Sequence, residues 1–236
     1  MSTDTDFGAA RRATGYAAIS NGVETLRSGF PLWLKVGFWA CVLIAVAAVV
    51  RRAVALLIPP SVNAPPQLAE LDAVFAARAA LTWIHIGCAL ALVMLLPFLF
   101  WSRTRGSRVL EQTFFLLGLV VAASAYAMST HAVGGMVERS AVLFFNSLFV
   151  VCLARACFFW SRRDDVRKGR WILRAVAVLL GIATTRPVMG VFFATAPLTH
   201  LTPSQFFGVA FWIGFSFNTL AMEVWLRRSP AGKMQA

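Results

Sequence analysis

Charged residues are scarce in this sequence, and acidic residues are the scarcest. Only 14% of its 236 residues are Asp, Glu, Lys or Arg, against roughly 25% in an average soluble domain, and 59% are hydrophobic. This composition excludes an ordinary soluble domain, which needs a charged surface. A mean hydropathy of +0.72 instead indicates an integral membrane protein, whose first partner is the lipid bilayer.

Sequence motifs of familiar enzymes and metal sites are also missing. The chain has no P-loop, nucleophile elbow, HExxH or paired-carboxylate motif, so hydrolase and NTPase functions have no support, and whether the protein is an enzyme stays open. The four cysteines lie inside apolar runs and form no CxxC, which predicts neither disulfides nor a metal site. The net charge of +12 is spread over short loops, so no nucleic-acid partner is expected.

Long apolar runs are what the chain does contain. At about 20 residues for each crossing of the hydrocarbon, they predict an all-α bundle of about six transmembrane helices. The runs are Pro31–Val50 (continuing to Pro59), Phe75–Trp101, Val109–Thr130, Val137–Trp160, Gly169–Ala194 and Pro203–Leu226. We expect one domain over residues 30–228, with tails at 1–29 and 229–236. No apolar segment follows Met1 at signal-peptide distance, so a cleaved leader is not predicted.

Arginine and lysine alternate between the loops. The rich segments are the N-terminal tail, the loop after the second run, the loop after the fourth run and the C-terminal tail, with Arg11, Arg12, Arg27, Arg103, Arg105, Arg108, Arg162, Arg163, Arg167, Lys168, Arg170, Arg227, Arg228 and Lys233. Because positive loops stay in the cytoplasm, both termini should be cytoplasmic. The Pro-rich segment, the turn at Gly134 and the loop at His200 should lie outside.

Three polar residues lie toward the outer side of the predicted bundle, where burying them in the membrane costs free energy. They are His85, His131 and Arg186. The two histidines are candidates for ligands of a b-type haem, although His85 lies roughly 10 Å deeper by helix rise. A quinone or another small molecule, or purely structural hydrogen bonds, are the alternatives. Arg186 precedes Pro187, which predicts an interrupted helix with either an anion site or an ion pair with Glu138. We expect all three side chains to line one cavity.

A second polar group is predicted at the inner side from the geometry of a helical hairpin. Runs five and six are antiparallel, so Arg174 and Glu223 should meet at equal depth about one turn inside the membrane. We predict a direct ion pair between them, structural more than catalytic, with Asn218 hydrogen-bonding across the same interface about one turn deeper.

Several short segments resemble a bacterial family of predicted membrane proteins, the domain of unknown function twenty-three oh six. The likeness covers roughly residues 81–227 and rests on Ile84-His85-Ile86-Gly87, His131-Ala132-Val133-Gly134-Gly135, Trp171-Ile172-Leu173-Arg174, Thr185-Arg186, and Asn218 with Glu223. The family usually has two further histidines, where this chain reads Arg108-Val109-Leu110-Glu111 and Lys168-Gly169-Arg170. The resemblance implies a bacterial inner-membrane location but no established reaction.

Together these patterns predict a multi-pass inner-membrane protein that acts as a redox or small-molecule-binding module at its outer side, with haem or quinone as the ligand. The alternative is a non-catalytic subunit of a membrane complex or a small transporter, in which the histidines and Arg186 only hold helices together. A membrane-protein partner or a homo-oligomer fits either interpretation.

The loop charges generate a testable topology. A reporter fused after Arg228 should behave as cytoplasmic, so alkaline phosphatase should be inactive there and a fluorescent protein should fold. Phosphatase inserted at the Gly134 turn should be active. Phosphatase activity at the C-terminal fusion would overturn the orientation.

Overall fold

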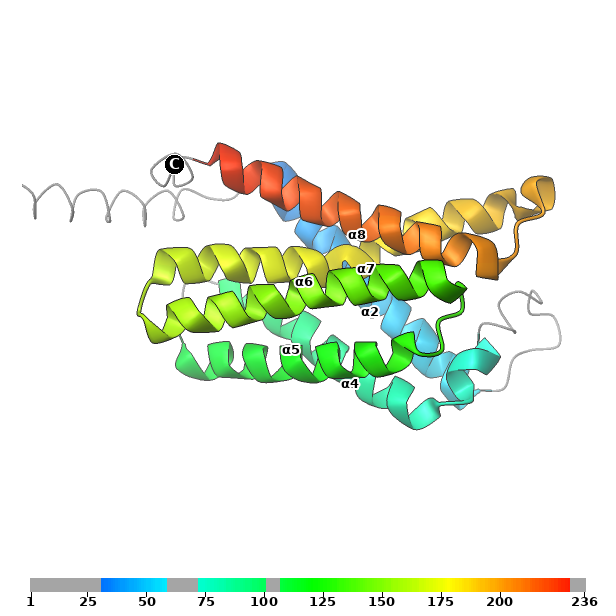
Figure 1. Ribbon diagram of the computed structural model, residues 1–236, viewed down its shortest axis with the longest axis horizontal. Coiled ribbons are helices and arrows are strands. Elements are labelled where there is room, and N and C mark those ends of the chain that lie inside the picture. Colours follow the sequence, from blue (N-terminus) through cyan, green and yellow to red (C-terminus); the bar gives the residue numbers. More distant parts are fainter. Residues whose placement is uncertain (1–30, 59–71, 101–106, 230–236) are drawn as a thin grey trace, which may run out of the picture.

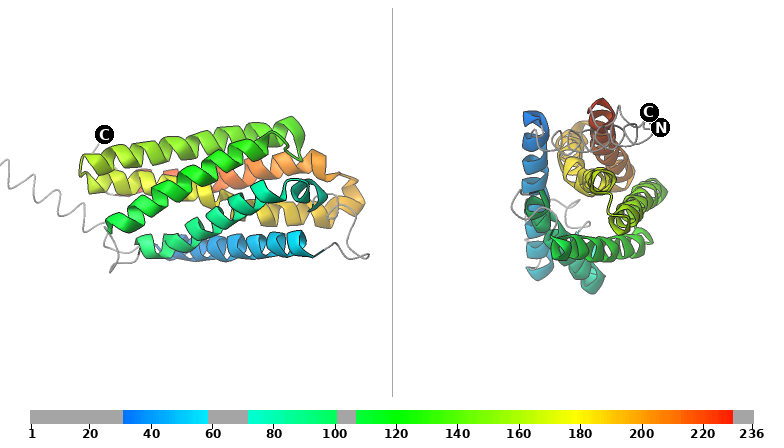
Figure 2. Two further views of the ribbon diagram at one scale, coloured as in Figure 1. Left: turned by 90° about the horizontal axis from the view of Figure 1, so that it is seen from below. Right: turned by 90° about the vertical axis from the view of Figure 1, so that its left-hand side faces the viewer.

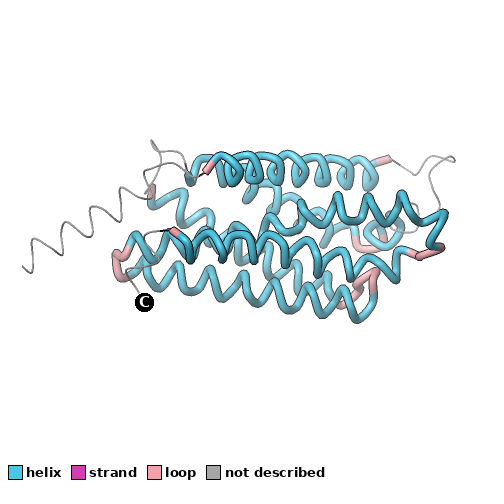
Figure 3. The backbone as a smooth tube through the Cα atoms, turned by 90° about the horizontal axis from the view of Figure 1, so that it is seen from above, coloured by secondary structure: helices cyan, strands magenta, loops and turns pink. Residues whose placement is uncertain are grey.

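The computed structural model describes residues 31–58, 72–100 and 107–229, and over these ranges it contains helices and no strand (Figure 3). The predicted tails, the Pro-rich segment and most of the loop after the second run lie outside the described residues. Six helices are long and apolar enough to cross a membrane: α2 Leu32–Leu57, α4 Ala79–Phe100, α5 Arg108–Ser129, α6 Gly135–Ser161, α7 Asp165–Thr199 and α8 Pro203–Arg228 (Figure 1). The prediction of an all-α six-helix bundle is confirmed.

Two helices, α4 and α7, differ in their bounds from the apolar runs. The second run was expected to begin at Phe75, but residues 72–76 form a separate short helix and α4 begins at Ala79. α7 starts before the expected Gly169 and ends after the expected Ala194. Its N-terminus is fixed by Asp164, whose carboxylate accepts a hydrogen bond from the Arg167 N–H at 3.0 Å. Polar capping residues therefore extended this helix beyond its apolar part.

The predicted interruption at Pro187 is wrong in its strong form. α7 is one continuous helix of 35 residues that contains both Pro187 and Pro197. A proline inside a helix removes one hydrogen bond and clashes with the carbonyl four residues earlier, which bends the helix without ending it when neighbouring helices hold both halves. Figure 1 shows the last part of α7 running at an angle to its first part.

α7 is the central helix of the bundle. It packs against α2, α6 and α8, and the view along the bundle in Figure 2 shows it between these three helices. It also has the largest share of buried residues among the six apolar spans, 44%. We call the end of the bundle with the α5–α6 turn (130–134) and the α7–α8 turn (200–202) the outer end, following the predicted orientation, and the opposite end the inner end.

Glycines bring α7 and α8 into close contact. A Cβ atom added at Gly214 of α8 would lie 2.6 Å from the Thr185 backbone nitrogen and 2.7 Å from its Cα, and one added at Gly181 of α7 would lie 2.9 Å from the Phe215 Cα. Real side chains do not come this close to a backbone. Small residues therefore set the distance between the two helices, as is common where helices pack in a membrane.

This contact predicts that Gly214→Ala destabilises the protein. Overpacking of this kind costs about 1 to 3 kcal/mol, because backbone atoms of α7 must shift. Thermal unfolding of the purified protein in detergent measures the effect. Gly190→Ala is the matched control, since its new methyl group would meet nothing within 4 Å. Equal melting temperatures for the two variants would contradict the assigned α7–α8 contact.

Candidate functional site

A cavity of about 240 Å³ lies inside the outer half of the bundle. Its polar lining comes from residues near the outer end, namely Arg52, Thr82, His85, Ser129, His131, Glu138 and Arg186, with Asn146 the one polar residue placed deeper. Its deeper walls are apolar and include Val93, Phe145, Phe149, Val178, Leu179 and Phe215. The structure thus brings His85, His131 and Arg186 to one cavity, as the sequence analysis expected.

Arg186 makes no hydrogen bond and no ion pair with the described residues, although the Glu138 carboxylate is near enough for its charge to act on the guanidinium. Its Nε is enclosed and makes no hydrogen bond, and no ion pair includes it. The ion pair with Glu138, which was the alternative interpretation, is not formed. Glu138 Oε2 instead accepts a hydrogen bond from the Gly134 N–H at 2.6 Å at the start of α6, where the helix dipole favours an acidic side chain. The Arg186 guanidinium is therefore left to face the cavity.

Arg52 is the second guanidinium in the lining, and its place there was not predicted from the sequence. An arginine near the end of a membrane helix can extend to the interface, but Arg52 is only 7% exposed. Its Nη1 donates to Asp72 Oδ1 at 2.5 Å, and its guanidinium lies 3.9 Å from the centre of the Phe75 ring. Arg51 is exposed and donates to both oxygens of the same carboxylate. The scarcity of acidic residues could have marked Asp72 as a partner for these arginines.

Both histidines are held by neighbouring hydroxyl groups. His85 Nδ1 lies 2.8 Å from Ser124 Oγ of α5, and His131 Nδ1 lies 2.6 Å from Thr130 Oγ1. His85 is half-buried about two turns into α4, whereas His131 is exposed in the turn after α5. Each ring is therefore oriented through Nδ1. The His85 ring also has a hydrogen-bonding contact with the backbone of Val121.

The fixed charges around the cavity favour a ligand that accepts hydrogen bonds. Two guanidiniums, of Arg52 and Arg186, and one carboxylate, of Glu138, line the cavity. Outside the lining, Asp72 forms ion pairs with Arg52 and with Arg51. Away from bulk water, an uncompensated donor such as Arg186 is costly unless a ligand or water meets it. No group of metal-ligating side chains occurs in the described part of the chain. The site can bind and orient a polar head group between apolar walls.

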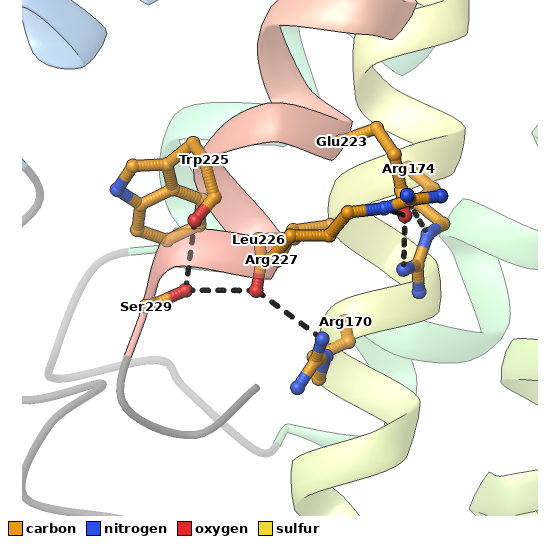
Figure 4. A network of polar contacts seen from close by, with 7 residues as sticks. All are labelled: Arg170, Arg174, Glu223, Trp225, Leu226, Arg227 and Ser229. Carbon is orange, nitrogen blue, oxygen red and sulfur yellow. Dashed lines mark hydrogen bonds and ion pairs between the residues drawn. The ribbon is translucent and has the colours of Figure 1, made fainter. Parts of the chain in front are cut away.

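The predicted ion pair at the inner end is present. Arg174 Nε donates to Glu223 Oε2 at 2.9 Å, and Arg227 Nε donates to the other oxygen of the same carboxylate at 2.9 Å (Figure 4). Nearer the middle of the membrane, the Thr184 hydroxyl donates to Asn218 Oδ1 at 2.8 Å, so Asn218 does bond across the α7–α8 interface. The purely structural role of this group stays a prediction.

A second inner-end ion pair was not predicted. Lys168 Nζ lies 2.7 Å from Glu111 Oε1, and both residues are buried, although Lys168 also meets the exposed Asp165. The pair joins α5 to α7, which no hairpin connects, so the depth arithmetic used for neighbouring helices could not find it. Its two residues stand in the segments where the family resemblance expects histidines.

Comparisons of this chain with protein-family models, curated proteins and solved structures found no match. The fold and the apolar spans define a multi-pass integral membrane protein in a lipid bilayer. Membership of the family suggested by the short segments stays a prediction.

The two inner-end ion pairs, Lys168–Glu111 and Arg174–Glu223, should contribute differently to stability. Replacing the carboxylate of each should therefore lower the free energy of unfolding by a different amount. Glu111→Ala should destabilise by about 2 to 3 kcal/mol, because Lys168 loses its buried carboxylate partner and keeps only the exposed Asp165, in a site where the side chains of the Lys168–Glu111 pair are 10% and 7% exposed. Glu223→Ala should cost about 1 to 2 kcal/mol, since Arg174 and Glu223 are 22% and 31% exposed and Arg174 can reach water.

Thermal unfolding of both single variants in one detergent tests this order. The double variant Arg174→Glu with Glu223→Arg should recover part of the loss, with Arg227 opposing full recovery by repulsion at i,i+4. Single variants as stable as the parent, or a larger cost at Glu223 than at Glu111, would contradict it.

Proposed function

We propose that the protein is a small-molecule-binding module of the bacterial inner membrane, and that its outer-end cavity takes the head group of a quinone-type molecule. The observation that carries this proposal is Arg186, a guanidinium that makes no hydrogen bond and no ion pair with the described residues, in the lining of an otherwise largely apolar cavity. The carbonyl oxygens of a quinone head accept hydrogen bonds. The head is also uncharged, so its binding moves no net charge into the membrane.

The distribution of the lining supports an amphiphilic ligand. Polar groups gather at the outer end, near the depth of lipid head groups, and the walls become apolar toward the middle of the bilayer. A ring with oxygen substituents and an isoprenoid tail has the same polarity gradient. The tail would lie along the apolar walls, where each buried methylene contributes about 0.8 kcal/mol.

Size favours a single ring over a haem macrocycle. Pockets for drug-sized ligands enclose roughly 300 to 1,000 Å³, and this cavity of about 240 Å³ is below that range. The histidines also occupy unequal positions, one half-buried in α4 and one exposed in a turn. A quinone would make the module part of a redox process, and the structural-subunit alternative predicts no ligand in the cavity.

Binding of a short-chain benzoquinone to the full-length protein in lipid nanodiscs tests the proposal, with tryptophan fluorescence quenching as the readout. Arg186→Gln should raise Kd by about tenfold or more, because a hydrogen bond to a charged donor is lost. Arg139→Gln is the matched control. It removes an exposed arginine next to Glu138 that is not part of the cavity lining, and it should leave Kd unchanged.

Two results would overturn the proposal. The first is the absence of saturable quinone binding by the unsubstituted protein, which would favour the structural alternative. The second is a Soret band that shifts on reduction of the purified protein, which would replace the quinone with haem. Equal losses in Arg186→Gln and Arg139→Gln would place the binding elsewhere.

A further inference from the structure

We infer that the cavity discriminates between the two redox forms of its ligand and binds the quinol more tightly than the quinone, with His85 as the specificity-determining residue. The inference rests on the proposed function, since it names the form of the ligand that the same cavity takes. It is argued from the hydrogen bonds that hold the His85 ring.

The first step concerns the hydroxyl hydrogen of Ser124. A serine hydroxyl has one hydrogen to donate and can accept with its lone pairs. Ser124 Oγ lies 2.8 Å from the Val120 carbonyl oxygen and 3.0 Å from that of Val121, and it donates its hydrogen to these carbonyls of its own helix. We therefore assign the third contact of this oxygen, with His85 Nδ1, as one in which Ser124 accepts.

The second step follows for the imidazole. A neutral imidazole has one N–H and one bare nitrogen. If Nδ1 donates to Ser124, Nε2 is bare and can only accept a hydrogen bond. The ring's other polar contact is with Val121, whose carbonyl oxygen also meets Ser124 Oγ, so we assign it to the Nδ1 side. Nε2 is not among the enclosed, unpartnered polar atoms, and His85 lines the cavity. An oriented acceptor is therefore available to a ligand.

The third step combines this acceptor with Arg186. A guanidinium only donates hydrogen bonds, so Arg186 selects an oxygen with free lone pairs, which both forms of the ligand have. His85 Nε2 requires a ligand donor, and only the quinol has hydroxyl hydrogens. The quinone would place a carbonyl oxygen against the bare nitrogen, so two acceptors would face each other and Nε2 would gain no hydrogen bond. Ser124 acts through His85 and is a positioning residue.

Paired binding measurements test the inference. A short-chain benzoquinol, kept reduced under anaerobic conditions, and the matching benzoquinone are titrated into the full-length protein in nanodiscs. We expect the quinol to bind about fivefold tighter or more, the difference that one hydrogen bond makes. His85→Phe and Ser124→Ala should reduce this ratio to near one, mainly by weakening quinol binding.

Thr113→Ala is the matched control. Thr113 lies on the same helix and its hydroxyl also donates to a carbonyl of that helix, Val109 at 2.8 Å, but it is not part of the cavity lining. It should keep the quinol preference. Equal affinity of the unsubstituted protein for the two forms would overturn the inference and leave the proposed function standing, whereas failure of both forms to bind would overturn both.

The tautomer of His85 provides a readout that needs neither a ligand nor a substituted protein. The chain has only three histidines, so nitrogen-15 spectra of imidazole-labelled protein are simple to assign. We expect His85 to have a protonated Nδ1 and a bare Nε2 in the unsubstituted protein. A protonated Nε2 with a bare Nδ1 would overturn the inference.

Discussion

The cost of placing charge in a bilayer is the constraint on which this structure depends. Every carboxylate in the described part of the chain is held by a cation or by a backbone N–H; these are Asp72, Glu111, Glu138, Asp164, Asp165 and Glu223. In a sequence with only 10 acidic residues against 22 basic ones, partners are in short supply. Arg186 is left over, and its unmet donor groups distinguish the outer cavity from the rest of the bundle.

Packing explains why the cavity lies where it does. α7 and α8 meet closely because Gly181 and Gly214 let backbones approach, and large side chains fill the core at the inner end. At the outer end the lining comes from α2, α4, α5, α6, α7 and α8. The proline bend in α7 lies in this region, and so does Arg52 with its partner Asp72. Polar side chains here take the place of the apolar packing that fills the rest of the core.

The sequence predicted most of the fold and part of the site. Apolar length gave the six helices, since a bilayer of fixed thickness imposes a minimum on each. The Arg174–Glu223 contact could be predicted because the two helices of a hairpin have the same rise per residue. Residues equally far from the connecting loop therefore lie at the same depth. The same depth calculation could not predict the ion pair between Glu111 and Lys168, because these residues lie on helices that are not consecutive in the chain. Nor could it show that Arg52 turns inward to Asp72.

The sequence by itself determined that the protein spans a membrane, where its helices lie, and that His85, His131 and Arg186 belong to the outer half of the bundle. Only the tertiary structure decided which polar groups have partners. Glu138 bonds to the start of its own helix, Arg186 stays unpaired within the described chain, and Ser124 orients His85. These outcomes depend on the rotation of each helix about its own axis. Side-chain packing sets that rotation, and a calculation of depth along the axis cannot predict it.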